Sequence, residues 1–277
     1  MTRENTSLLN RLEKDLPEGL LVDAAWLKKR GYSPQLQSHY VSAGWLEQPA
    51  RGVYRRPRGS LSWQQVIISL QTLLLRNPVT VGGRTALDLH GFTHYVSKET
   101  REVHLYAPKR LPGWLFKLPL KVRFVYHNSE KLFRNDPITF GLGSLKWDVS
   151  KNERDAFGFT KQPWGQWDWP MTLSTPERAI LELLDELPDR ESFHQVDKLM
   201  EGLSSLSPRR LQKLLADCQN VKVKRLFFFF ADRHKHAWLK RLNKNDIDFG
   251  KGKRMLVKGG KFDRTYQITV PEDFYAG

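Results

Sequence analysis

Cysteine and long hydrophobic runs are scarce in this sequence. Cys218 is the single cysteine among 277 residues, which excludes a framework of internal disulfide bonds and fits a reducing compartment. The most apolar stretch, residues 226–231, is far too short to cross a bilayer. The polar opening MTRENTS does not have the apolar core of a secretory signal. We therefore expect a cytoplasmic protein without a membrane partner.

Sequence patterns typical of active sites and metal sites are missing as well. The run Gly82-Gly83-Arg84 lacks the Gly-Lys-Ser/Thr ending of a phosphate-binding loop, so we interpret it as an ordinary loop. His234 and His236 are two positions apart, which on a helix points them about 200° from each other and makes them poor joint ligands. No Gly-x-Ser-x-Gly nucleophile elbow occurs. We predict a protein that is not an enzyme and has no metal and no cofactor.

Positive charge, in contrast, is abundant. The chain has 45 Lys and Arg against 30 Asp and Glu, a formal net charge of +15 and a pI near 9.9. Such a balance favours an anionic partner, which could be nucleic acid, an acidic protein or a membrane surface. The excess is uneven, because residues 1–60 hold 10 basic and 6 acidic side chains whereas residues 220–266 hold 14 and 4. The larger excess therefore lies near the C-terminus.

Residues 20–58 have the order of elements of a winged helix-turn-helix. Asp23 is a good N-cap for a first short helix, which Gly31 ends. Ser33 caps a second helix with Pro34 at its first position, and Gly44 ends it. A strand, a turn at residues 49–52 and a returning strand then form a hairpin rich in arginine. This order predicts a mode of docking to DNA in which the second helix enters the major groove and the hairpin contacts the neighbouring phosphates.

The polar side chains of the second helix are of the types that read base edges, and the hairpin arginines are of the type that grips phosphates. We predict that duplex DNA is contacted from the second helix by Ser33, Gln35, Gln37, Ser38, His39 and Ser42, and from the hairpin by Arg51, Tyr54, Arg55, Arg56 and Arg58. The alternative is a small helical subdomain with an ordinary solvated face.

Beyond residue 58 the pattern predicts an α+β protein, with a winged helix-turn-helix domain and its following helices at 1–95 and a mixed α/β domain at 96–277. Apolar periodicity and capping residues predict further helices, and alternation predicts strands at 102–107 and 122–126. The helices are expected at 7–16, 62–76, 85–90, 174–187, 193–203, 208–218 and 221–242, and a hairpin with a glycine turn at 255–270.

Two stretches of the second domain could contact partners. Trp164, Trp167 and Trp169 lie in a region of weak periodicity, where we expect them to pin a long loop onto the core, with stacking on bases as the alternative. The C-terminal basic surface consists of charges in glycine-punctuated loops. We predict that it faces an acidic partner or an RNA, with a merely solvated basic surface as the alternative; its residues are Lys251, Lys253, Arg254, Lys258, Lys261 and Arg264.

Four stretches in this order resemble a known family: RGVYRRP, GGRTALDLHGF, STPERAILELL and KRMLVKGGKFDRTYQITVP. The sequence is similar to the AbiEi-type antitoxins of abortive-infection type IV toxin–antitoxin pairs over nearly its whole length, least so at residues 133–169. The resemblance implies a winged-helix domain that represses its own operon at inverted repeats. It also implies a C-terminal domain that counters a toxin of nucleotidyltransferase fold. The alternatives are an enzyme acting on nucleic acid and a transcription factor that senses a ligand in a pocket of residues 96–277.

Overall fold

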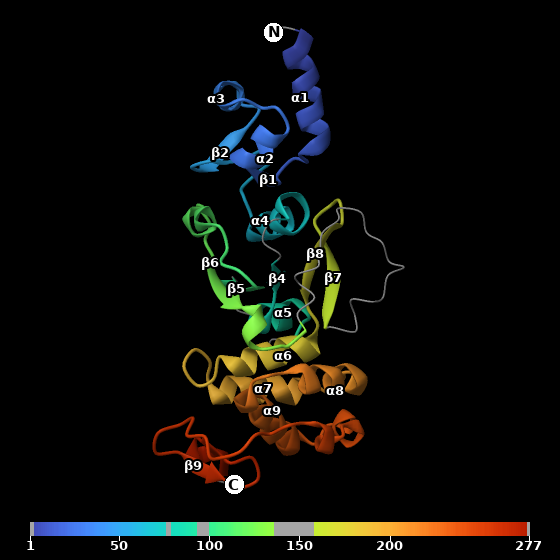
Figure 1. Cartoon of the computed structure of the whole chain (residues 1–277), viewed down its shortest axis with the longest axis vertical. Coiled ribbons are helices and arrows are strands. Elements are labelled where there is room, and N and C mark those ends of the chain that lie inside the picture. Colours follow the sequence, from blue (N-terminus) through green and yellow to red (C-terminus); the bar gives the residue numbers. More distant parts are fainter. Residues whose placement is uncertain (1–2, 76–78, 93–99, 136–157, 276–277) are drawn as a thin grey trace.

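The elements of the protein are stacked along one long axis (Figure 1). The computed structural model describes residues 3–75, 79–92, 100–135 and 158–275. From one end to the other come an N-terminal unit, a five-stranded sheet, a layer of helices and a small C-terminal hairpin. Buried apolar side chains connect all of these layers into one cluster that runs from Leu9 to Phe274. The fold is α+β, as predicted.

The N-terminal unit is a winged helix-turn-helix with the predicted caps. Asp23 Oδ1 accepts a hydrogen bond from Trp26 N at 2.7 Å, and Ser33 Oγ accepts one from Leu36 N at 3.2 Å. A third strand, β1, was not predicted from the sequence; it pairs with β3 and gives a sheet of order β1-β3-β2. The elements are α1 (Arg3–Asp15), β1 (Leu21–Asp23), α2 (Ala24–Lys29), α3 (Pro34–Ser42), β2 (Glu47–Ala50) and β3 (Val53–Arg55).

Helix α4 (Trp63–Ser69) joins this unit to the rest of the molecule. Ser62 and Gln65 form a reciprocal capping box at its start, and it continues as a π-helical turn, η1 (Leu70–Leu74). The Ser69 hydroxyl accepts a hydrogen bond from Leu21 N in β1, while the Gln71 side chain donates to Thr172 O and accepts from Thr172 N in the central sheet. One helical segment therefore holds both sheets. The stop predicted at Asn77-Pro78 lies outside the described residues.

The central sheet is mixed, with strand order β6-β5-β4-β8-β7. Its middle strand, β4, comes from the stretch predicted to belong to the first domain, and the boundary predicted at 95/96 falls outside the described residues. β4 runs parallel to β8 and antiparallel to β5, and β5 runs parallel to β6. The strands are β4 (Thr80–Val81), β5 (Glu102–Ala107), β6 (Arg123–Asn128), β7 (Phe159–Trp164) and β8 (Trp169–Ser174).

The tryptophan-rich stretch is a β-hairpin, so the prediction of a loop is wrong from residue 159 onward, whereas the predicted packing onto the core is confirmed for the buried Trp169. Trp164 and Trp169 pair across β7 and β8, and Trp167 lies in the turn between them. The Trp167 ring lies tilted against Trp169, with centroids 5.0 Å apart, and the Arg58 guanidinium lies over the Trp167 ring, 4.0 Å from its centre. The hairpin turn therefore contacts the winged unit through a cation–π interaction.

The helical layer consists of a helix that directly follows β4 and of the helices that follow β8. The four Phe side chains of residues 227–230 are buried, as predicted, but the helix that carries them is shorter than predicted. It ends at His234 because Lys235 has a left-handed backbone, with φ of 50°, and residues 237–241 form a separate 3-10 turn. The helices are α5 (Gly83–Leu89), α6 (Pro176–Asp185), α7 (Phe193–Gly202), α8 (Pro208–Asp217) and α9 (Val221–His234).

The C-terminal hairpin has its turn at a different place from the one predicted. Strands β9 (Lys261–Asp263) and β10 (Ile268–Val270) are joined at residues 264–267, after Gly259-Gly260 rather than around it. Asp263 Oδ1 accepts a hydrogen bond from Tyr266 N, and Gln267 has a φ of 52°, which together close the turn. No helix in the described ranges is long and apolar enough to cross a membrane.

A buried carboxylate ties the layers together. Glu182 in α6 is fully buried and accepts hydrogen bonds from Gly83 N at 2.9 Å, Ser174 Oγ at 3.0 Å and Arg178 Nε at 2.8 Å. A Cβ on Gly82 would lie 2.3 Å from Glu182 Oε2, so this close approach requires glycine. The segment interpreted as a loop is thus the first turn of α5, and the anion at that turn is the protein's own carboxylate.

We expect Glu182→Ala to lower the free energy of unfolding by about 3–5 kcal/mol, because the buried Arg178 guanidinium would lose its carboxylate partner. Urea denaturation followed by circular dichroism measures the change. Glu201→Ala is the control: Glu201 pairs with Lys198 on the exposed face of α7, and its loss should change stability by less than about 0.5 kcal/mol. A loss below about 1 kcal/mol in Glu182→Ala would contradict this role.

Candidate functional site

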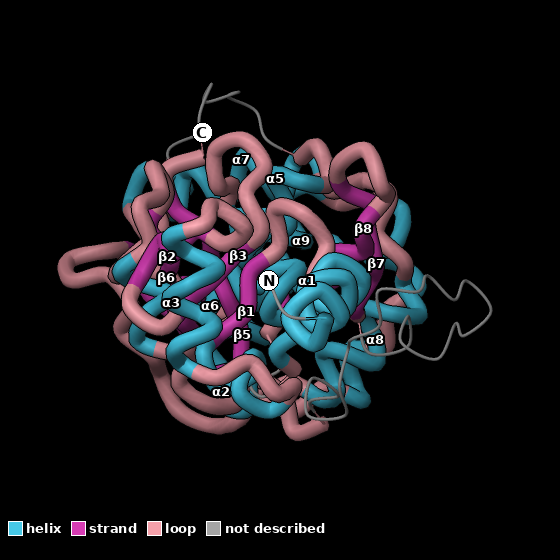
Figure 2. Tube along the Cα trace, turned by 90° about the horizontal axis from the view of Figure 1, so that it is seen from above, coloured by secondary structure: helices cyan, strands magenta, loops and turns pink. Residues whose placement is uncertain are grey.

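Helix α3 presents a polar face at the outer end of the molecule (Figures 1 and 2). Gln35, Ser38, His39 and Ser42 are exposed on it. Gln37, which was predicted to contact DNA, is instead 4% exposed, and its Nε2 donates a hydrogen bond to Tyr32 O at 2.8 Å. Gln37 fixes the start of α3 and cannot reach a base. The Ser33 hydroxyl is likewise engaged as the N-cap.

Most of the hairpin arginines are engaged inside the winged unit. Arg55 is 5% exposed, and its Nε donates to Glu47 at 2.6 Å while its Nη2 donates to Gly59 O at 2.6 Å. Arg56 donates to Leu16 O at the end of α1, and Arg58 pairs with Glu18. These three side chains, which were predicted to contact phosphates, attach the end of β3 and the segment after it to the rest of the unit.

The exposed cation of the hairpin is Arg51, at the turn between β2 and β3. Tyr54 is half-buried, and its hydroxyl accepts a weak hydrogen bond from Gln48 Nε2 at 3.4 Å. Lys28 and Lys29 are exposed at the end of α2, beside the turn that leads into α3. They were overlooked in the sequence, although a helix-turn-helix places the end of its first helix next to the phosphates.

The C-terminal basic surface is exposed at all six predicted positions, at the opposite end of the molecule from α3 (Figure 1). Its shape is set by Arg225, which is 3% exposed and donates to the carbonyls of Phe249 at 2.8 Å and Gly252 at 2.7 Å. Burial and the nearby Arg254 lower the pKa of Arg225. A buried guanidinium thus holds the glycine-rich loop that carries the exposed lysines.

The polar cleft, a cavity of about 1020 Å³, was not predicted from the sequence. It lies between α5, the β5–β6 pair and the start of α7. The parallel register of β5 and β6 pairs His104 with Val125 and Tyr106 with His127, and so places both histidines on one face. The residues that line it include Arg84, Asp88, Arg101, Glu102, His104, Arg123, Val125, Tyr126, Arg190, Glu191 and Gln195.

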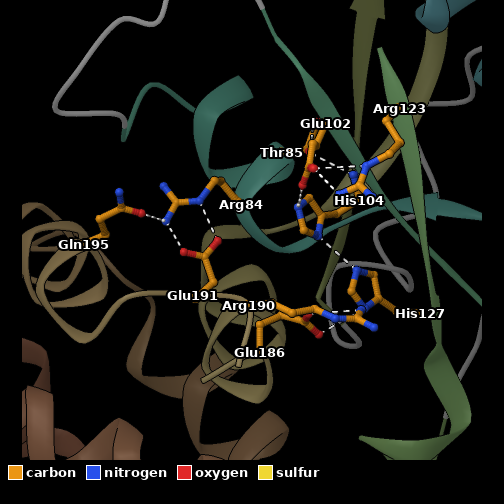
Figure 3. Close-up of polar contacts among 10 residues, drawn as sticks. All are labelled: Arg84, Thr85, Glu102, His104, Arg123, His127, Glu186, Arg190, Glu191 and Gln195. Carbon is orange, nitrogen blue, oxygen red and sulfur yellow. Dashed lines mark hydrogen bonds and ion pairs between the residues drawn. The ribbon is translucent and has the colours of Figure 1, made fainter. Parts of the chain in front are cut away.

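A chain of three side chains leads from the cleft into the protein (Figure 3). His104 Nδ1 lies 3.0 Å from His127 Nε2, and His127 Nδ1 lies 3.0 Å from Glu186 Oε1. The rings stack, with centroids 5.1 Å apart for the two histidines and 4.6 Å apart for His127 and Tyr106. This His104–His127–Glu186 relay is an arrangement that can hold or pass a proton.

The surroundings of the relay set its protonation. Burial and the neighbouring His127 lower the pKa of His104. Burial raises the pKa of Glu186, but the hydrogen bond and charge of His127 and the charge of Arg190 outweigh it and lower that pKa overall. At neutral pH the relay therefore holds an ionised Glu186 behind an uncharged His104. Among the described residues, no group of three or more His, Cys, Asp or Glu could hold a metal ion.

Two family models together match nearly the whole chain. The one described as the N-terminal domain of the transcriptional regulator AbiEi antitoxin matches residues 5–98, and the one described as the transcriptional regulator, AbiEi antitoxin, of a type IV TA system matches residues 100–271. No curated protein is a match. The crystal structure of the RV2827C protein from Mycobacterium tuberculosis has a similar fold, with a TM-score of 0.54 at 15% identity over 97% of this chain and 92% of that one.

Proposed function

The chain belongs to the AbiEi antitoxin family of transcriptional regulators of type IV toxin–antitoxin systems, and we propose that it represses its own operon and counters a toxin of nucleotidyltransferase fold. The observation that carries the first half is the exposed polar face of α3 inside a capped helix-turn-helix with a three-stranded wing. It acts in the cytoplasm on duplex DNA with inverted repeats.

The DNA contacts that the geometry favours are fewer than those predicted from the sequence. Gln35, Ser38, His39 and Ser42 reach the base edges, and Arg51 binds a phosphate at the neighbouring backbone. Lys28 and Lys29 add phosphate contacts from the end of α2, where they are exposed. Arg55, Arg56 and Arg58 act indirectly, because their guanidinium groups hold the wing in place.

Arg51→Ala should weaken binding to every DNA sequence and reduce the slope of log K against log salt by about one, because one phosphate contact is lost. His39→Ala should instead reduce the preference for the operator over unrelated DNA, by about 1–3 kcal/mol if His39 reads a base. Fluorescence anisotropy over a salt series measures both. Lys198→Ala, an exposed cation of α7, is the matched control and should change neither quantity. An unchanged salt slope in Arg51→Ala would exclude Arg51 from the interface.

The antitoxin activity is proposed to lie in residues 96–277, and within them on the C-terminal basic surface. Two features support this assignment: the surface lies at the other end of the molecule from α3, and Arg225 holds its loop in a fixed shape. β4 and α5 belong to residues 1–95, yet they form part of the central sheet and the helical layer that residues 96–277 build. The two activities are therefore best separated by charge changes in the full chain rather than by truncation.

The triple change Lys258→Glu, Lys261→Glu and Arg264→Glu should leave operator affinity unchanged and abolish rescue of cells that express the toxin. Reversed charge at these exposed positions would repel an acidic partner or an RNA, as like charges at an interface do. The control is Arg209→Glu, Lys213→Glu and Lys240→Glu, which reverses three exposed cations elsewhere. If operator affinity falls and rescue persists, the surface serves nucleic-acid attraction instead.

The protein is proposed to catalyse nothing by itself. If the protein were an enzyme, the His104–His127–Glu186 relay would be the candidate active site, since it resembles acid–base machinery. Labelled DNA, RNA and nucleotides incubated with the purified protein and Mg²⁺ or Mn²⁺ should be recovered unchanged. Turnover that disappears in His104→Gln would establish an activity and overturn this proposal.

A further inference from the structure

We propose that the polar cleft binds the phosphate group of a small phosphorylated molecule, with His104 Nε2 as the donor at its floor. This inference goes beyond the proposed function and does not depend on it. It would make the regulator responsive to a ligand through its second half.

The hydrogen-bond order of the relay leaves one nitrogen for a ligand. The ionised Glu186 can only accept, so His127 Nδ1 donates to it. The other nitrogen of His127, Nε2, is hydrogen-bonded to His104 Nδ1 at 3.0 Å, and this bond occupies His104 Nδ1 whichever of the two atoms carries the proton. His104 Nε2 remains, on a ring that lines the cleft, with Glu102 Oε2 as its nearest charged neighbour at 4.0 Å. Once protonated, that nitrogen is a charge-assisted donor for an anion.

An anion bound in the cleft would give the protonated His104 a negatively charged partner on its cleft side. The protonated His104 would lie between the ligand on one side and Glu186, acting through His127, on the other. The pKa of His104 is lowered in the empty cleft by burial and by His127, so the proton should be taken up when the anion binds. The charged and titratable groups around His104 come from the elements that enclose the cleft: Arg101 just before β5, Glu102 and Tyr106 on β5, Arg123 and His127 on β6, Arg84 and Asp88 on α5, and Glu186, Arg190 and Glu191 in the segment after α6.

The rim favours one phosphate group rather than a nucleic-acid strand. In the empty cleft Arg190 pairs with Glu186 and Arg123 pairs with Glu102. Their side chains are 61% and 74% exposed, so both can turn toward a ligand, whereas the less exposed Arg84 is held by Glu191. Glu102, Glu191 and Asp88 alternate with these cations around the opening. A polyanion would meet all of these carboxylates, whereas a single phosphate over His104 would lie nearest to Glu102, whose charge is paired with Arg123.

The size of the cleft indicates a ligand larger than inorganic phosphate. About 1020 Å³ is at the upper end of the range for small-molecule sites, about 300–1,000 Å³. Val125 and Tyr126 of β6 lie on its wall and could contact an apolar or aromatic part of the ligand. A phosphorylated metabolite of nucleotide size fits this combination.

Isothermal titration calorimetry of the full chain tests the proposal with AMP, inorganic phosphate and adenosine. AMP and phosphate should bind and adenosine should not. A short oligonucleotide with and without a 5′-phosphate decides whether the phosphate may also belong to a nucleic-acid end. Sulfate, which keeps its charge between pH 6 and 8, isolates the histidine: its affinity should fall about tenfold per pH unit above the pKa of His104 in the free protein. Titrations in two buffers of different ionisation enthalpy should show proton uptake.

His104→Gln and Arg190→Gln should each weaken AMP binding about 10- to 100-fold, the loss expected for one charge-assisted hydrogen bond. His194→Gln and Arg209→Gln are the matched controls, since both residues are exposed outside the cleft, and AMP affinity should be unchanged in them. Equal binding of adenosine and AMP, no binding of either phosphate probe at millimolar concentration, or AMP affinity that persists in both cleft variants would overturn the proposal. If His104→Gln does not fold, the pH dependence of sulfate binding to the unaltered protein decides the matter alone.

Discussion

The arrangement of the second half depends on the burial of one carboxylate. Glu182 holds the first turn of α5 through Gly83 N, the end of β8 through Ser174 and its own helix through Arg178. Because these segments flank β4, the same contacts fix how the middle of the sheet meets the helical layer. Glu186, four residues further on, is the C-cap residue of α6, so the position of the relay in the polar cleft is set by the same anchor.

The capping residues of α2, α3 and α4 were predicted correctly, whereas pairing between distant segments has no visible signal in the sequence. Asp23, Ser33 and Ser62 are caps whose partners lie within three residues, and all three cap as predicted. β1 is only three residues long and exists because it pairs with β3, more than thirty residues away. The relay was missed for a related reason: His104 and His127 each sit in an alternating strand, and only the parallel register brings their rings together. The turn at residues 264–267 was missed because Gly259-Gly260 is the stronger local signal.

The wing shows why a cluster of arginines is an ambiguous signal. A guanidinium has five donors, and carbonyl groups and carboxylates inside a small unit satisfy them as well as phosphates do. Arg55, Arg56 and Arg58 have such partners within the unit, and Arg51 extends from the turn. Composition predicted a basic wing correctly, but which arginines face outward depends on packing against α1 and on Glu47. The six cations of the C-terminal basic surface are all exposed as predicted, and one of them, Lys261, lies in β9 rather than in a loop.

Because β4 is the middle strand of the central sheet, this sheet can form only after all of its strands have been synthesised. The winged unit pairs residues that are close in sequence, and its anchor to α4 joins Leu21 to Ser69, 48 positions apart. β4 can pair with β8 only after β8 has been synthesised, since the Thr80 hydroxyl donates a hydrogen bond to Thr172 O, which lies 92 positions further along the chain. On a translating ribosome, the half that carries α3 can therefore assemble while the partner strand of β4 has yet to emerge. Newly made chains would pass through a stage in which the winged unit is formed and the central sheet and the helical layer are not.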